Sequence, residues 1–127
     1  LKVAQRLSEQ RPEDLPPLNL CLQVNIDNAP TKSGVTPEAT LELARAVAAL
    51  PRVRLRGLMA IPDPSNDPDV QRQRFHELAS LLAELRRGVD NGGLDTLSMG
   101  MSGDLEAAIA EGATIVRLGT ALFGPRD

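Results

Sequence analysis

Apolar and polar residues alternate between Leu18 and Ile26 in a way that predicts a β-strand. Every second residue of this stretch is apolar, and the four residues between them are Asn19, Cys21, Gln23 and Asn25. A period of two puts all the apolar side chains on one face of a strand and the polar ones on the other. Further along, Thr36-Pro37-Glu38 supplies an N-cap, a first-turn proline and an early acid, which predict a helix that ends near Pro51.

The same unit of strand and helix recurs along the chain. Capping residues, helical spacing of apolar residues and terminal glycines or prolines set the expected boundaries. A further helix over residues 1–7 would precede the first strand. The remaining expected elements are a strand from Val53 to Ile61, a helix from Asp67-Pro68 to Gly88, a strand from Thr96 to Met101, a short helix that begins at Ser102, and a strand from Thr114 to Thr120.

Strands that alternate with helices predict parallel pairing through right-handed crossovers. An open doubly wound sheet and a barrel both fit that order. The polar face of residues 18–26 favours the barrel, because central strands of an open sheet are covered on both faces and are apolar throughout. We therefore expect an α/β fold with four βα repeats, the C-terminal half of a (β/α)8 TIM barrel, whose missing strands precede Leu1.

Composition narrows the class of protein. The chain has 127 residues, 42% of them hydrophobic, and a formal net charge of -3, as expected for one globular domain. The basic residues are scattered, so neither nucleic acid nor a membrane surface is an expected partner. Cys21 is the only cysteine and no apolar run of about 20 residues occurs, so we expect a cytoplasmic protein.

Arg117 is the first candidate for a ligand contact. In the expected last strand it shares a face with Ile115 and Gly119, opposite to Val116, and that face would line the barrel interior. A guanidinium in such a place needs an anion or a strong acceptor beside it. A ligand would satisfy it, and so would a salt bridge to an interior carboxylate.

Two short loops suggest a phosphate site. Ser102-Gly103 and Gly119-Thr120 follow the last two expected strands, and the loops in those places often bind phosphate in barrel enzymes. Ser102 can donate its hydroxyl, and glycine lets the backbone approach phosphate oxygens closely. The alternative for Ser102 is a plain N-cap that needs no ligand.

Five stretches of the sequence resemble the pyridoxal-phosphate homeostasis proteins, the YggS/PROSC family, and together they extend over nearly the whole chain. The stretches are Asn25-Ile26, Lys32-Ser33-Gly34, residues 56–62 (RGLMAIP), residues 97–109 (LSMGMSGDLEAAI) and residues 116–124 (VRLGTALFG). The resemblance implies a single barrel domain of the alanine-racemase type that binds pyridoxal 5′-phosphate (PLP) and helps to control its supply to apo PLP-dependent enzymes.

The resemblance also implies roles for individual residues. Ser102, Gly119 and Thr120 would hold the phosphate, and Arg117 would approach the pyridine nitrogen. An arginine there stays charged and cannot protonate the ring strongly, which makes the cofactor a poor electron sink. We expect a carrier or regulator of PLP, without catalytic residues.

The lysine that forms a Schiff base with PLP in this family lies on an early barrel strand, which this sequence does not contain. The only lysines are Lys2 and Lys32, and we expect Lys32 to be a solvated loop residue. Residues 1–127 are thus expected to be the C-terminal half of the domain, with a surface that binds either the N-terminal half or a second copy.

Two other functions remain open. The chain could come from a fold-type III PLP enzyme, such as an amino-acid racemase or decarboxylase, although we expect no second domain after Asp127. It could also be an unrelated barrel enzyme that acts on a sugar phosphate.

The remaining polar candidates have simpler interpretations. His76 has no partner at metal-ligand spacing and is expected at the surface, so we predict no metal site. Cys21 is expected to be a packed thiol. The alternating Arg52, Arg54 and Arg56 are expected to form a solvated rim at the end of the barrel away from the ligand.

Overall fold

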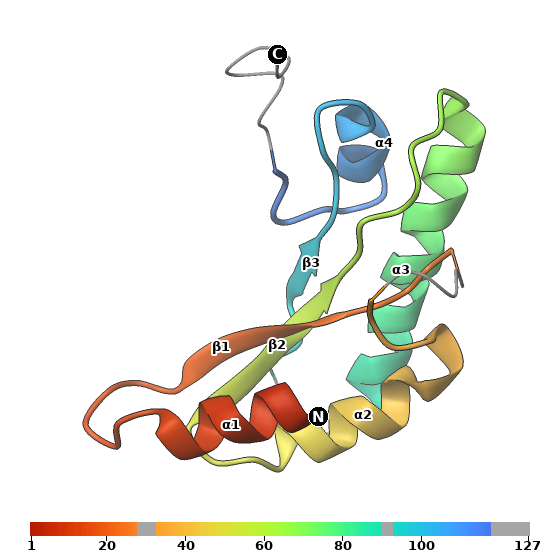
Figure 1. The fold of residues 1–127 in the computed structure, drawn as a ribbon. Coiled ribbons are helices and arrows are strands. Elements are labelled where there is room, and N and C mark those ends of the chain that lie inside the picture. Colours follow the sequence, from red (N-terminus) through yellow and green to blue (C-terminus); the bar gives the residue numbers. More distant parts are fainter. Residues whose placement is uncertain (28–32, 90–92, 118–127) are drawn as a thin grey trace.

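A computed structural model describes residues 1–27, 33–89 and 93–117 of the chain (Figure 1). Strands and helices alternate through most of it, as the hydrophobic pattern predicts. The elements in chain order are α1 (Lys2–Gln10), β1 (Leu18–Gln23), the 3-10 turn η1 (Pro37–Ala39), α2 (Thr40–Ala48), β2 (Val53–Met59), α3 (Pro68–Gly88), β3 (Thr96–Ser98) and α4 (Leu105–Ala110).

The three strands form one parallel sheet in the order β1-β2-β3. Each of the two crossovers contains a helix, so the predicted α/β class with parallel pairing is confirmed. The strands are shorter than predicted at their carboxyl ends. Beyond β1, Val24 forms an isolated parallel bridge with Val35 instead of continuing the strand.

The fourth predicted strand is not present as a strand in the described residues. Ile115 makes one isolated parallel bridge with Ser98, and its carbonyl accepts a hydrogen bond from the Met99 N–H at 3.0 Å. Residues 118–120 of the predicted strand lie outside the described part of the chain. The bridge has the position and direction predicted for a fourth strand next to β3, but the number of βα repeats stays a prediction.

The start of α4 differs from the prediction. The helix begins at Leu105, with Asp104 at its N-cap position, and not at Ser102. Residues 101–104 instead form a turn, in which Asp104 N–H donates to the Met101 carbonyl at 3.2 Å and the Asp104 carboxylate accepts from Met101 N–H at 2.7 Å. This local pairing satisfies the backbone before the helix begins, so the prediction that Ser102 begins the helix is wrong.

The predicted start of α3 is correct. Asp67 caps the helix by accepting a hydrogen bond from Asp69 N–H at 3.0 Å, and Pro68 occupies the first turn, where a missing N–H costs nothing. The Thr36 side chain likewise accepts from Ala39 N–H, at the start of η1.

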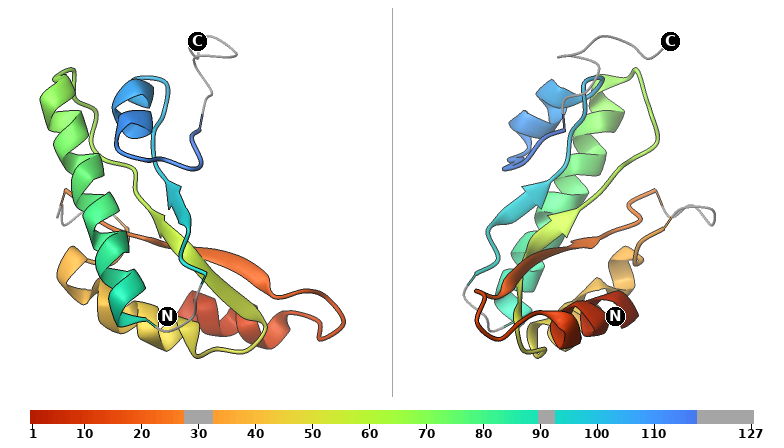
Figure 2. Two further views of the ribbon diagram at one scale, coloured as in Figure 1. Left: turned by 180° about the vertical axis from the view of Figure 1, so that it is seen from behind. Right: turned by 60° about the vertical axis from the view of Figure 1, so that its left-hand side comes forward.

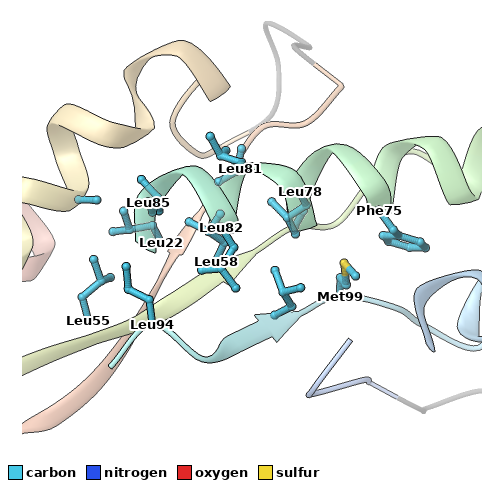
Figure 3. Packing of buried hydrophobic residues seen from close by; sticks show 14 of the residues in the cluster. Leu22, Leu55, Leu58, Phe75, Leu78, Leu81, Leu82, Leu85, Leu94 and Met99 are labelled. Atoms are coloured by element: carbon cyan, nitrogen blue, oxygen red, sulfur yellow. The ribbon is translucent and has the colours of Figure 1, made fainter. Parts of the chain in front are cut away.

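Helices α2 and α3 cover one face of the sheet, as Figure 2 shows. The core lies between α3 and strands β2 and β3, and Figure 3 shows its leucines facing one another across that interface. Phe75 is 1% exposed and Leu58 and Leu78 are fully buried. Burying such side chains contributes about 1.5 to 3 kcal/mol each, so this interface holds α3 firmly against the strands.

The other face of the sheet carries the polar residues of β1. Asn19 and Cys21 are exposed, whereas Leu22 is 9% exposed and Val24 is 2% exposed on the helix-covered face. The prediction of a polar face thus holds for Asn19 and Cys21, whereas Gln23 is half-buried and Asn25 is 8% exposed, so the predicted polar face is not open throughout. No helix among the described residues is long and apolar enough to cross a membrane.

Candidate cofactor site at the carboxyl ends of the strands

The segment that contains Arg117 runs beside the loop that follows β3. Arg117 N–H donates to the Gly100 carbonyl at 2.9 Å. Ser102 is two residues beyond Gly100, in the turn before α4. The structure thus brings two of the four predicted ligand residues, Ser102 and Arg117, to neighbouring segments at the same end of the sheet.

Gly100 permits this close approach. Its φ is +105°, a conformation that side chains disfavour, and a Cβ on it would lie 2.6 Å from the Ala108 Cβ and 3.3 Å from the Val116 Cγ1. A larger residue would push apart α4 and the segment before Arg117. The glycine therefore fixes the spacing between the two sides of the candidate site.

The Arg117 side chain is only partly satisfied. Its Nη2 donates to the Ala60 carbonyl, at the end of β2, at 3.2 Å. Its Nε is buried and has no hydrogen-bond partner among the residues that the structure describes. Among the described residues no carboxylate forms an ion pair with Arg117, so the salt bridge considered as an alternative from the sequence is not found there. A buried donor on a permanent cation is costly unless an acceptor binds to it.

The Ser102 turn borders a solvent-open hollow of about 590 Å³ between the first turns of α3 and α4. Ser102 itself is half-buried. Gln71, on α3, donates a hydrogen bond from its side-chain nitrogen to the Gly103 carbonyl at 3.3 Å. Gly119 and Thr120 lie outside the described residues, and so does Lys32, so the predictions for these three residues stay predictions.

A cluster that the sequence does not predict connects the segments that follow β1 and β2. The Asp27 carboxylate, 7% exposed, lies 3.1 Å from the Arg74 Nε and accepts from Asp63 N–H at 2.7 Å. Arg74 also donates to the Asp63 carbonyl at 2.6 Å. No pattern of spacing links residues 27, 63 and 74, so the sequence carries no signal for this cluster.

Arg56, which the sequence suggested as part of a solvated rim, has an acidic partner at the surface. Its guanidinium binds the Asp95 carboxylate through two nitrogens, at 2.9 and 2.5 Å. The hydrogen bond from Arg56 is the main reason that the pKa of Asp95 is lowered to about 2. Arg52 also has a partner, since its Nε donates to the Ser8 carbonyl at 2.7 Å.

Cys21 and His76 show no sign of a reactive or metal-binding role. Cys21 is exposed and not packed as expected, and partial desolvation raises the pKa of its thiol, which disfavours the reactive thiolate. His76, 69% exposed as predicted, contacts Glu111 at 3.1 Å. Within residues 1–27, 33–89 and 93–117 no group of histidine, cysteine and acidic residues could hold a metal ion.

The fold and the matched sequence define the family. The sequence model of the family described as alanine racemase, N-terminal domain, matches residues 1–127, which is the whole chain. The chain therefore belongs to this family.

The names of curated relatives indicate a narrower class of protein within this family. A protein of Pseudomonas aeruginosa named pyridoxal phosphate homeostasis protein is 62% identical over 127 residues. The protein of the same name from Escherichia coli (strain K12) is 51% identical over the same length. Each alignment covers 100% of this chain and 53% of the relative, so the chain spans about half the length of the curated relatives that it matches.

Solved structures agree with this assignment. PipY of Synechococcus elongatus, solved without PLP, has a TM-score of 0.87 and 36% identity, over 97% of this chain and 57% of PipY. The structure described as PipY with PLP bound has a TM-score of 0.85 and 35% identity over the same shares. A lysine/ornithine decarboxylase from Vibrio vulnificus, at 17% identity and a TM-score of 0.60, covers 94% of this chain and 36% of the enzyme and shows the likeness of fold alone.

Proposed function

We propose that this chain is part of a protein that binds PLP and takes part in intracellular PLP homeostasis. The names of the relatives from Pseudomonas aeruginosa and Escherichia coli support this function, as does the PLP-bound form of PipY. The observation within this chain that carries the proposal is the buried Arg117 Nε, which has no hydrogen-bond partner in the described part of the chain. An acceptor atom of a bound cofactor would satisfy it.

The proposal includes a division of the domain. Residues 1–127 would be the C-terminal half of a single (β/α)8 barrel, and the N-terminal half would supply the lysine that forms the Schiff base. Three observations support this: the chain spans about half of its relatives, its strands are parallel, and its helices α2 and α3 cover only one face of the sheet. The uncovered polar face would line the barrel interior.

Within this site Ser102, Gly119 and Thr120 would hold the phosphate, and Arg117 would face the pyridine nitrogen. PLP supplies a ring that withdraws electrons when its nitrogen is protonated. The guanidinium would keep its own protons and would donate a hydrogen bond to the nitrogen without protonating it. The Ala60 carbonyl orients the guanidinium through Nη2, which leaves Nε for the ligand. We therefore expect binding of PLP without turnover of amino acids.

The experiment compares PLP with pyridoxal, which lacks the phosphate. Ser102→Ala in the full-length protein should weaken PLP binding by about 1 to 3 kcal/mol, because one hydrogen bond to a charged group is lost. Pyridoxal affinity should stay the same. Ser80→Ala, an exposed serine on α3, is the matched control and should change neither affinity. Unchanged PLP affinity for Ser102→Ala would remove Ser102 from the phosphate site.

A further inference from the structure

The Gln71 side chain connects two loops at the carboxyl end of the sheet. Its amide nitrogen donates to the Ser65 carbonyl, in the loop after β2, at 2.5 Å, and to the Gly103 carbonyl, in the turn after β3, at 3.3 Å. Gln71 lies in the first turn of α3, whose buried leucines fix the helix to the sheet. The amide is therefore a hydrogen-bond donor on a firmly packed helix, and it contacts the turn next to Ser102.

The turn is open to solvent at Gly103, where a hydrogen bond from a neighbouring element can hold it. A Cβ built on Gly103 would meet no atom within 4 Å, and the turn borders the open hollow between α3 and α4. Glycine has the widest choice of backbone conformations, so the peptide groups around Gly103 can rotate unless hydrogen bonds hold them. Asp104 closes the turn from within, through its contact with Met101 N–H, and Gln71 holds it from outside.

Arg72, the neighbour of Gln71, binds a different part of the chain. Its Nε and Nη2 both bind the Glu111 carboxylate at 3.2 Å, at the far end of α4. Of these two adjacent residues, Gln71 thus binds the turn before α4, which contains Ser102, and Arg72 binds the residue that follows α4.

We propose that Gln71 is a positioning residue for phosphate recognition, which rests on the proposed function of the Ser102 turn. By fixing the Gly103 carbonyl it fixes the peptide planes of the turn, and so the direction in which the backbone N–H groups and the Ser102 hydroxyl point. Groups that are already oriented bind a ligand without the entropic cost of ordering them. Gln71 acts on the phosphate through the turn and does not contact it.

The test uses Gln71→Met in the full-length protein, because methionine keeps the length of the side chain and removes the donor. PLP affinity should fall about 3- to 10-fold, because the turn loses one hydrogen bond and must then be ordered when the phosphate binds. Affinity for pyridoxal should change less than about twofold. Gln73→Met is the matched control, since Gln73 is an exposed glutamine on the same helix, and it should change neither affinity.

The outcomes separate the possible roles. Equal losses for PLP and pyridoxal would show that Gln71 only supports the fold, and unchanged PLP affinity would show that the turn does not need it; either result overturns the proposal. Equal affinities of PLP and pyridoxal for the unmodified protein would overturn the phosphate site itself. If Gln71→Met does not fold, Gln71→Asn replaces it, because the shorter amide cannot span both carbonyls and should give the same selective loss for PLP.

Discussion

The Arg56 guanidinium and the Asp95 carboxylate join β2 to the residue before β3 through two parallel hydrogen bonds. Arg56 extends from the strand, and Asp95 N–H also donates to the Arg56 carbonyl at 2.9 Å. The side chains and the backbone thus hold the same pair of residues together. The two-point geometry makes this pair more specific than a single surface contact.

This pair predicts a particular acid sensitivity. The pKa of Asp95 is lowered to about 2 in the folded protein, from a usual 3.8, so the pair stabilises the fold above about pH 4 and this contribution is lost as the pH falls toward 2. Asp95→Asn should therefore lower the urea midpoint at pH 7, and the difference from the unmodified protein should shrink by pH 2.5. The control is Asp14→Asn, at an exposed carboxylate before β1. A difference for Asp95→Asn that is the same at both pH values would contradict the prediction.

A second prediction concerns the contact between β2 and β3. A Cβ on Gly57 would lie 1.7 Å from the Thr96 carbonyl oxygen, a backbone atom in the paired strand. Gly57→Ala must therefore separate the two strands, and we expect it to lower the free energy of unfolding by about 1 to 3 kcal/mol or more. Gly103→Ala is the control, because a Cβ there meets nothing within 4 Å, and it should change stability by less than about 0.5 kcal/mol. Equal effects of the two substitutions in urea unfolding would rule out the close approach.

The sequence predicted the parts of this fold that depend on local signals. Asp67 and Pro68 set the start of α3, and the alternation in residues 18–26 identified the two faces of β1. The start of α4 could not be predicted, because Ser102 and Asp104 can both cap a helix. The choice between them depends on the hydrogen bond that Asp104 makes with Met101.

Residues that connect separate loops also could not be predicted from the sequence. Gln71 looks like any polar residue on a helix surface, and its importance comes from two carbonyls that are 6 and 32 residues away. For Arg117, the alternation of side chains along the last predicted strand indicated a side chain that points inward. A guanidinium in that place needs an acceptor. Only the structure shows that Nη2 binds Ala60 and that Nε has no partner within residues 1–27, 33–89 and 93–117.

The third prediction uses the unpaired Nε to separate ligand binding from folding. Without a ligand, Arg117 should contribute little to stability, because a partly buried cation without an anion is costly to desolvate. Arg117→Met should leave the ligand-free protein as stable as before, or up to about 1 kcal/mol more stable, and should remove most of the thermal stabilisation that PLP gives. Thermal unfolding with and without PLP measures both effects.

Arg74→Met is the matched control for Arg117→Met. Arg74 pairs with the largely buried Asp27 carboxylate, so its loss should destabilise the ligand-free protein. A loss of more than about 2 kcal/mol for Arg117→Met without PLP, far above the net value of one hydrogen bond, would show that Arg117 is a structural residue.

The last prediction tests the proposed division of the barrel. Ile61, Met101 and Ile115 lie at or beyond the carboxyl ends of the strands and are 42%, 47% and 50% exposed. In a complete barrel such side chains would be covered. We expect this chain to associate with a separately produced N-terminal half, and the mixture to bind PLP covalently and reducibly through the lysine of that half. This chain alone should bind PLP weakly and without a stable covalent link.

Two matched substitutions locate the interface. Ile115→Glu should weaken association of the halves at least about tenfold, because a charge would be buried in the interface. Ile109→Glu, at a 59% exposed position on α4, should change this association less than about twofold. Analytical ultracentrifugation of the mixed and single chains measures both, and it also detects pairing with a second copy. If this chain by itself is a monodisperse monomer that binds PLP tightly and covalently, the half-barrel proposal is wrong, and Lys32 becomes the first candidate for the covalent link.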